Sequence, residues 1–374
     1  MHFSLTDEQK LLQESVEKFI EQEYPFELRQ ERSGSPLGFS ESIWAKYAEL
    51  GWLGIGISEE DGGYGGGAVE TAIVLEGLGA GLAVEPYLSA VVMTGALLGA
   101  REPHRAVLAE TATGRTRVAF ALAERHSRYD LSRVAVSARR DGNGWVLNGA
   151  KSVALNADSA HKIVITARTG GEPGDREGIT VFLVDAGSPG LDRRGYPTVD
   201  GLRAAEVTLS DVRATDGDRI GEVGKGLPLI ERAVDAGTVG LCAEAAGIMR
   251  HAYQSTVEYL RGREQFGQPL IRFQALQHRV VDMFVEAELS RSMAYMAAVR
   301  YEEDSPETRP AIASAKLHTA KSSRKVGEEA IQLHGGMGMT DEMAISHYFK
   351  RLSTINATFG DYDHHLEYLV NRVA

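Results

Sequence analysis

Apolar side chains recur every three to four residues over the first part of the chain, from Leu5 to about residue 115. This spacing predicts helices, the first of them with one apolar face made by Leu11, Leu12, Val16, Phe19 and Ile20. Thr6 and Gln9 have the spacing of a capping box, which predicts that this helix begins at Thr6. The glycine-rich run 59–67 has no strand before it, so it indicates a loop rather than a phosphate-binding turn.

The period changes in the middle of the chain. Short runs rich in β-branched residues, separated by turn sequences, predict strands at 118–122, 134–138, 145–147, 162–166, 180–184 and 206–209. Several short strands with no helix between them favour a compact antiparallel barrel or sandwich. They disfavour the alternating strands and helices of a Rossmann sheet, so a nicotinamide cofactor is not expected.

The helical period returns in three long runs, at 229–259, 273–301 and 311–333. Long helices joined by short connections predict a helical bundle. The sequence therefore predicts a mainly α fold with a central β domain. Its three parts are an N-terminal helical domain (1–116), a middle β-barrel domain (117–224) and a C-terminal four-helix bundle (225–374).

Composition narrows the class of function. Forty Lys and Arg against 52 Asp and Glu give a net charge of −12, which disfavours a nucleic-acid partner. No apolar run approaches the ~20 residues of a membrane span, and the polar segment 1–9 does not predict a signal peptide. A single cysteine, Cys242, allows neither a disulfide framework nor a Cys-based metal site. We therefore expect a cytoplasmic, oligomeric enzyme that binds neither nucleic acid nor membrane.

The last third of the chain contains histidines that are candidate metal ligands and cations that are candidate contacts for a substrate. The adjacent pair His364 and His365 points to different helix faces, and no histidine there has a carboxylate at a clean ligand spacing, so no metal site is expected. Four cations are expected to lie on helix surfaces, with one or more available to an anionic substrate; they are Arg291, Lys316, Lys321 and Arg324.

Two motifs carry the clearest chemical signal. Residues 263–270 read Arg-Glu-Gln-Phe-Gly-Gln-Pro-Leu, and residues 332–338, about 60 positions later, read Gln-Leu-His-Gly-Gly-Met-Gly. An arginine supplies a planar donor fork for a pyrophosphate, and glycines let the backbone approach phosphates closely. In this order, within helical, β and helical parts, the motifs resemble the paired FAD-binding motifs of the acyl-CoA dehydrogenase family.

The resemblance covers essentially the whole chain and implies an FAD cofactor. In the family these motifs hold the ADP half of an FAD that mostly belongs to a neighbouring subunit, which implies at least a dimer. The contacts carried over to this chain are Arg263, Gln265, Phe266, Gln332, Gly335 and Gly336.

The family's flavin-ring motifs are matched poorly. An acidic residue, a proline and a Gly-Ala-Gly-Ser-Asp turn usually follow the first strand, and here residues 124–130 keep only Glu124 and Asp130. The family's Trp-Ile-Thr after Gly-x-Lys is replaced by Val153, Ala154 and Leu155. An aliphatic side chain cannot donate a hydrogen bond to the flavin, so the redox end of a bound FAD would be poorly tuned.

The base of the family's reaction is also missing from its usual positions. Dehydrogenation needs a carboxylate that removes the α-proton while hydride leaves Cβ for flavin N5. The resemblance places this glutamate at Phe359, or in some members at about Gly237. Two substitutes remain. Glu244 lies seven residues after Gly237, about 10 Å along nearly the same helix face, and Asp361 lies two residues after Phe359. The alternative roles are a salt-bridged helix residue for Glu244 and a turn cap for Asp361.

Within the family, segments 123–131, 194–197 and 347–361 are similar to the small subunits of pimeloyl-CoA dehydrogenases. This implies an acyl-CoA substrate, the CoA thioester of a dicarboxylic acid, together with a large partner subunit that supplies the base and an electron-transfer flavoprotein as acceptor. Three alternatives stay open. One is a self-sufficient homo-oligomer, a dimer or tetramer, that uses Glu244 or Asp361. The others are a non-catalytic acyl-CoA-binding or assembly subunit, and a flavin monooxygenase, which needs no α-proton base.

Overall fold

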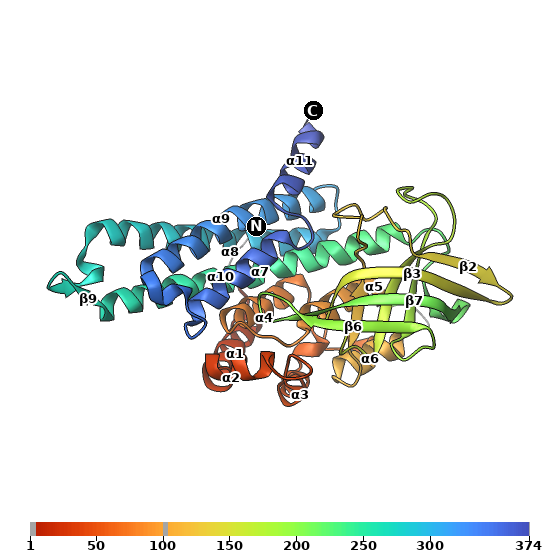
Figure 1. The fold of residues 1–374 in the computed structure, drawn as a ribbon, viewed down its shortest axis with the longest axis horizontal. Helices are drawn as coiled ribbons and strands as arrows, with labels where there is room; N and C mark the ends of the chain where they lie inside the picture. Colours follow the sequence, from red (N-terminus) through yellow and green to blue (C-terminus); the bar gives the residue numbers. More distant parts are fainter. Residues whose placement is uncertain (1–4, 100–103, 374) are drawn as a thin grey trace. The chain divides into compact units, whose positions relative to one another are not determined.

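The computed structural model describes residues 5–99 and 104–373 and divides them into two compact units. Unit 1 contains the described residues up to Glu31, then Ala68–Ala83, and those from Thr238 onward. Unit 2 contains Arg32–Gly67 and the described residues of Val84–Gly237. Residues 1–4 of the polar N-terminal segment lie outside the described residues. The predicted fold class is confirmed, because long helices and one central sheet make up the chain (Figure 1).

The sheet of unit 2 has eight strands: β1 (Val118–Ala121), β2 (Ser137–Asp141), β3 (Gly144–Leu155), β4 (Lys162–Arg168), β5 (Ile179–Asp185), β6 (Leu191–Pro197), β7 (Arg203–Thr215) and β8 (Arg219–Ile220). Their order is β6-β7-β3-β2-β4-β5-β8, and β1 pairs with β4. The sheet differs from the predicted antiparallel barrel in two ways. β1 and β2 pair with β4 in parallel, and the hydrogen-bonded order ends at β6 and β8 without joining them. The predicted strand at 134–138 was also misplaced, because only its last two residues belong to β2.

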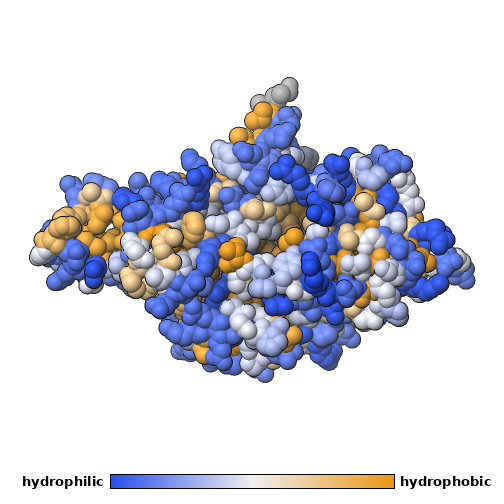
Figure 2. Space-filling view, viewed as in Figure 1, coloured by the Kyte–Doolittle hydropathy of each residue, from blue (hydrophilic) through white to orange (hydrophobic). Residues whose placement is uncertain are grey.

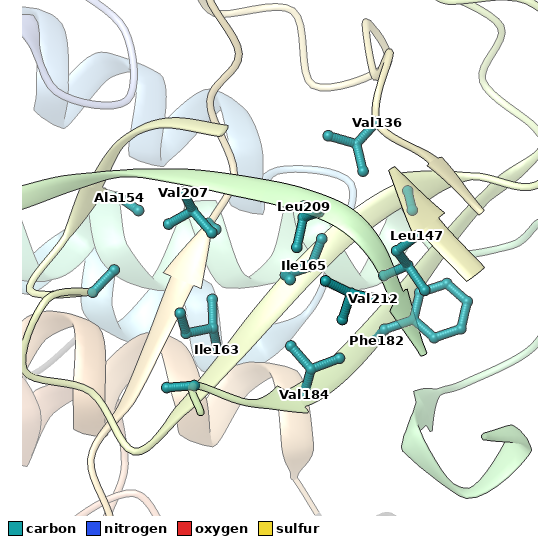
Figure 3. Close-up of a cluster of buried hydrophobic side chains, with 14 of the residues drawn as sticks. Val136, Leu147, Ala154, Ile163, Ile165, Phe182, Val184, Val207, Leu209 and Val212 are labelled. Atoms are coloured by element: carbon teal, nitrogen blue, oxygen red, sulfur yellow. The ribbon is translucent and has the colours of Figure 1, made fainter. Parts of the chain in front are cut away.

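The core of unit 2 follows the two-residue period of its strands. Side chains two positions apart point into one cluster, as Figure 3 shows for Ile163 and Ile165 of β4 and for Phe182 and Val184 of β5. The step on β7 is three residues, from Leu209 to Val212, because the register with β3 shifts there. Each such aliphatic or aromatic side chain stabilises the fold by roughly 1.5–3 kcal/mol on burial.

Short helices complete unit 2. They are the α-helices α3 (Glu41–Glu49), α5 (Thr94–Leu98) and α6 (Arg105–Ala112), the 3₁₀ turns Trp52–Gly54, Glu59–Asp61 and Asp216–Asp218, and the π-helical turn Leu88–Met93. The π-helical turn leads directly into α5. The run 59–67 forms a loop in which Gly62, Gly65 and Gly66 have positive φ, a conformation that glycine adopts without steric cost.

Unit 1 is built from long helices. They are α1 (Asp7–Glu23), α4 (Ala68–Ala80), α8 (Gln274–Glu303), α9 (Thr308–His334), α10 (Ala344–Ala357), α11 (Tyr362–Val373) and most of α7 (Leu227–Gly262) and of α2 (Phe26–Ser33). The residues of α7 up to Gly237 and the last two residues of α2 belong to unit 2. α9 packs against α8, α10 and α11. A two-stranded hairpin, β9 (Glu264–Gln265) and β10 (Gln268–Pro269), and the 3₁₀ turn Leu270–Arg272 join α7 to α8, and the 3₁₀ turn Gly335–Met339 follows α9. The predicted capping box is confirmed, because Thr6 and Gln9 bond to each other's backbone N–H groups. No helix of the described residues has the length and apolarity needed to span a membrane.

Glycines bring α4 and α7 into close contact. A Cβ added at Gly79 would overlap the carbonyl of Glu244, and a Cβ added at Gly247 would overlap the carbonyl of Glu76. Beside this crossing the Glu76 side chain, 3% exposed, accepts hydrogen bonds from Arg291 Nε (2.9 and 3.1 Å) and Tyr295 Oη (2.8 Å) of α8. The close approach therefore places a buried carboxylate within reach of α8.

We predict that Gly247→Ala destabilises the protein by about 1–3 kcal/mol, because the added methyl group forces α4 and α7 apart. Gly262→Ala is the matched control on the same helix, since a Cβ there meets nothing within 4 Å. Urea denaturation of both variants measures the difference. Equal stability of the two variants would contradict the close packing of α4 on α7.

Candidate functional site

The two motifs with nucleotide-binding character lie at the same end of the helical bundle in unit 1. Tyr259, one turn before Arg263, stacks on His334, the residue before Gly335, with 4.4 Å between ring centroids. The Arg263 backbone N–H bonds to the Tyr259 carbonyl at 2.9 Å and so continues α7 to this point. The end of α7 therefore meets the end of α9, and the motifs are brought together although about 60 residues separate them.

The side chains of the first motif are open to solvent. Arg263 and Gln265 are exposed, and Phe266 is 88% exposed. Phe266 and Gly267 both have positive φ (54° and 79°) in the two-residue turn between β9 and β10. This is the backbone of a tight hairpin, and it leaves the aromatic ring largely outside the fold.

The glycines of the second motif border open space. A Cβ added at Gly335 or Gly336 would meet no atom within 4 Å, so packing within the chain does not require glycine there. The neighbouring Gln332 is exposed. A guanidinium, exposed amides and an uncovered glycine backbone are a donor set suited to a pyrophosphate and its nucleoside. The residues present fit the ADP half of an FAD.

The segments that resemble the flavin-ring motifs are held together by a buried ion pair in unit 2. Lys151 is fully buried, and its Nζ donates to Glu124 Oε1 at 2.7 Å and to Thr166 Oγ1 at 2.6 Å. The Glu124 carboxylate also accepts the backbone N–H groups of Ala135 (2.8 Å) and Val136 (3.1 Å). Burial lowers the pKa of Lys151 to about 8, against the attraction of Glu124. Glu124 and Lys151 therefore hold the backbone of these segments in place.

Ser127 and Asp130 of segment 124–130 also form hydrogen bonds within or next to this turn. Ser127 Oγ donates to the Glu124 carbonyl, and Asp130 Oδ1 accepts the Ser132 hydroxyl at 2.6 Å and backbone N–H at 2.9 Å. Arg128 has a φ of 48°, in the left-handed region. Ser127 and Asp130 therefore stabilise the turn.

On β3 the Trp-Ile-Thr position forms a strained bulge. The register with β7 shifts between Lys151 and Ala154, and Val153 takes a φ of 51° with its side chain 52% exposed. A β-branched residue in this region costs roughly 1–3 kcal/mol and marks a constrained site. Neither Val153 nor Leu155 carries a side-chain donor, so these residues do not fit the polar edge of a flavin ring.

Residue 359 lies in a tightly held turn between α10 and α11. Phe359 and Gly360 have φ of 57° and 109°. The buried Lys316 of α9 donates from Nζ to the carbonyls of Asn356 (3.1 Å) and Gly360 (2.6 Å), and His365 Nε2 donates to the Phe359 carbonyl (3.1 Å). The backbone is fixed on both sides of residue 359, whose side chain carries no carboxylate.

Both substitute carboxylates have partners. Glu244 is 8% exposed, and its two oxygens accept Arg351 Nε at 2.6 Å and a second guanidinium nitrogen at 2.7 Å. Asp361 accepts the backbone N–H of His364 at 3.0 Å in the first turn of α11. Either group would have to exchange these partners before it took a proton from a substrate.

The expectation for two of the four cations was wrong. Lys316 is fully buried, and Arg291 pairs with the buried Glu76. Lys321 and Arg324 are exposed on α9 as expected. Lys316 shares its helix face with Ile312, Thr319, Ser323 and Val326, all buried, and this period was the available signal. Its long aliphatic stem makes a buried position physically acceptable.

Buried carboxylates other than the two substitutes were not anticipated. Glu76 follows a run of apolar residues in α4, and only its partners on distant helices explain its burial. Within residues 5–99 and 104–373, no group of three or more His, Cys, Asp or Glu side chains is arranged to hold a metal ion.

We predict that stability falls as the pH drops from 6.5 towards 4, partly through His365. Burial is the main cause that lowers its pKa from 6.5 to about 4, with the positive charge of Lys316 second. The unfolded chain then binds the proton more tightly than the folded one, so the contribution is complete above pH 6.5 and lost below it, by at most about 3 kcal/mol. Denaturation midpoints of wild type and His365→Asn between pH 4 and 7 measure it. A pH slope in the variant as steep as in wild type would rule out this origin.

The exposed donor groups at one end of the helical bundle suit the nucleotide of a flavin cofactor, whereas the segments expected at the flavin ring are altered. The first of these features is typical of a flavoprotein. Three family models match it in sequence: the acyl-CoA dehydrogenase N-terminal domain over residues 6–115, the middle domain over 119–212 and the C-terminal domain over 224–374. The chain belongs to the acyl-CoA dehydrogenase family.

Relatives of full length support the assignment. A probable acyl-CoA dehydrogenase, YngJ of Bacillus subtilis, is 32% identical over 357 residues, 92% of each chain. Butyryl-CoA dehydrogenase from Megasphaera elsdenii superimposes with a TM-score of 0.92 over 100% of both chains at 25% identity. A chain of the ChsE4-ChsE5 complex from Mycobacterium tuberculosis superimposes with a TM-score of 0.90 at 26% identity, over 100% of this chain and 99% of that one.

Family membership confirms the expected class of enzyme and cofactor. The chain is an acyl-CoA dehydrogenase family enzyme, an oxidoreductase acting on CH–CH groups, and FAD is the cofactor typical of the family. Acyl-CoA substrates and an electron-transfer flavoprotein as acceptor are also typical of it.

Proposed function

We propose that this chain is the small subunit of a heteromeric FAD-dependent acyl-CoA dehydrogenase, which introduces an α,β double bond into a CoA thioester. A large acyl-CoA dehydrogenase subunit would supply the catalytic base and the flavin-ring loops. FAD, when bound, supplies the hydride acceptor. The observation that carries the proposal is the turn at 356–361, whose backbone is firmly held while its central residue, Phe359, has no proton-accepting group.

The ion pair of Glu244 argues against a base within this chain. The Glu244 carboxylate accepts two hydrogen bonds from one guanidinium, so both of its oxygens are occupied. A self-sufficient enzyme based on Glu244 would need Arg351 to leave, and the guanidinium is itself only 7% exposed. Asp361 would likewise have to give up its bond to the first turn of α11.

The contrast between the two halves of the cofactor signature favours shared sites. Arg263, Gln265 and Phe266 face outward and are available to the nucleotide of an FAD held mainly by another subunit. The segments expected to meet the flavin ring in this chain lack its donors. An arrangement in which each subunit completes the other accounts for one half being intact and the other altered.

Exposed apolar side chains support oligomerisation. In Figure 2 hydrophobic surface gathers at the left end of the view, where Figure 1 places β9 and the beginning of α8. The exposed apolar residues of this segment are Phe266, Val281, Phe284, Val285 and Leu289. Contiguous patches of this kind usually mark contact surfaces. A relative solved as a complex, ChsE4-ChsE5, makes a two-component assembly a reasonable model for this chain.

The finer features of the proposal rest on the sequence. The similarity of segments 123–131, 194–197 and 347–361 to pimeloyl-CoA dehydrogenase small subunits favours a dicarboxylyl-CoA substrate, hence a role in dicarboxylic acid degradation. The domain boundaries near 116 and 224, the cytoplasmic location and the electron-transfer flavoprotein as acceptor belong to the same proposal. Among the alternatives, a non-catalytic assembly subunit requires that FAD is never bound, and a flavin monooxygenase requires turnover that depends on reduced flavin and oxygen.

Flavin content tests the proposal directly. The chain is purified alone and co-expressed with candidate large subunits, and the visible spectrum is recorded for each preparation. We expect flavin bands in the mixed complex, with FAD retained there and not by the chain alone. A mixed complex with no flavin would support the assembly reading and contradict this proposal.

We predict that Glu244→Gln leaves the rate of flavin reduction in the mixed complex within about threefold of wild type. The variant should instead be less stable by about 3–5 kcal/mol, because Arg351 is left as a buried charge without its partner. Glu286→Gln, which removes a partly buried ion pair on α8, is the control. A loss of 100-fold or more in the reduction rate with FAD still bound would identify Glu244 as the base.

We predict that Arg263→Ala weakens FAD binding by the mixed complex about 10- to 100-fold with no loss of stability. The reason is that one charge-assisted contact to phosphate is lost and an exposed side chain supports little of the fold. FAD release on dilution measures the affinity, and Arg324→Ala, another exposed cation, is the control. Unchanged FAD retention would remove Arg263 from the site.

A further inference from the structure

The ammonium group of Lys316 is buried inside unit 1. Lys316 is fully buried in the first third of α9, the helix that packs against α8, α10 and α11. Nζ donates to two main-chain carbonyls, those of Asn356 and Gly360, at 3.1 and 2.6 Å. A charged group so placed needs strong compensation for the water it has lost.

The end of α10 provides that compensation. Asn356 lies in the last turn of α10 (Ala344–Ala357), where carbonyls have no helical N–H to accept. The C-terminal end of a helix carries partial negative charge, so a cation is favoured there. The second carbonyl, that of Gly360, lies three residues beyond the helix, so the ammonium ties the helix end to the turn that follows.

This turn has a backbone that needs outside support. Phe359, a bulky residue, has a φ of 57°, and the next residue must be glycine, because a Cβ on Gly360 (φ 109°) would press against both His364 and His365. Bulky residues persist in the left-handed region only where surrounding contacts determine the backbone. Here the contacts are Lys316 on the carbonyls at 356 and 360 and His365 on the carbonyl at 359.

We propose that Lys316 is a positioning residue: its buried ammonium, bound to the carbonyls at 356 and 360, fixes the turn from which the side chain of residue 359 is presented. The backbone of the turn is therefore held in a fixed conformation in this chain, although residue 359 is a phenylalanine and not a carboxylate. The interpretation of position 359 as the base position rests on the proposed function, but the holding of the turn does not.

The ionisation of Lys316 gives the proposal a pH signature. Burial lowers its pKa to about 8, while the thiol of Cys242 on α7 and the carboxylate of Asp361 oppose the shift. The other titratable groups facing it are His364 and His365 of α11, whose pKa values it helps to lower. When the turn opens, Lys316 regains its ordinary pKa and binds a proton more tightly than in the closed turn, so the closed turn gains stability as the pH rises through 8.

Amide hydrogen exchange of the purified chain, without FAD or partner, tests the proposal. The amides to follow are those of Thr358, His364 and His365, which bond to Ile355 and Asp361 within and beside the turn. Lys316→Met, of similar length and without charge, should exchange at least tenfold faster at these amides, with peptides of α8 unchanged. Lys321→Met, an exposed position on the same helix, should match wild type throughout.

A pH series on wild type adds a test that needs no variant. After correction for intrinsic exchange, opening of the turn should fall about tenfold between pH 7 and 9, and Lys316→Met should show no such fall. Exchange at the turn that is as slow in Lys316→Met as in wild type, or independent of pH in wild type, would overturn the proposal. Because no flavin or partner is involved, such a result would leave the proposed function standing.

Discussion

The carboxylate of Glu76 fixes the helical unit at one buried point. It lies on α4 and is contacted by Arg291 and Tyr295 of α8, while Arg250 of α7 lies 3.7 Å away and also reaches Glu17 of α1. The Glu76 carboxylate therefore connects α4 with α7 and α8 directly, and with α1 through Arg250. A buried carboxylate is acceptable only when so many donors surround it, and removing one partner costs far more than the pair contributes.

The rest of the unit follows from this crossing. Because glycines let α4 and α7 touch, α7 is set at a depth that also buries Glu244, and Glu244 in turn binds Arg351 of α10. The end of α10 is then held by Lys316 of α9, and the turn at residue 359 follows at once. The charges of Glu244 and Lys316 are used here to hold helices in place. Because these side chains are bound to partners within the fold, their own structural roles limit the chemistry in which they can take part.

Local patterns in the sequence predicted much of the fold and little of this network. The capping box at Thr6 and the alternating core of β4 and β5 depend on neighbours in sequence, and both are found. The motif at Arg263 could be proposed from the sequence because its chemistry lies in one short segment. The pairing of Glu244 with Arg351 joins residues 107 positions apart, and the burial of Lys316 depends on α10 and α11. Neither is fixed by periodicity, nor is the parallel pairing of β1 with β4.

The central claim is that this chain lacks its own base. The most direct measurement is anaerobic mixing of the chain, supplied with excess FAD but no partner, with butyryl-CoA and pimeloyl-CoA, while the flavin absorbance is followed. The account predicts no bleaching by the chain alone, and bleaching once a large subunit is added. Bleaching of the flavin by the chain alone at an ordinary enzyme rate would contradict it.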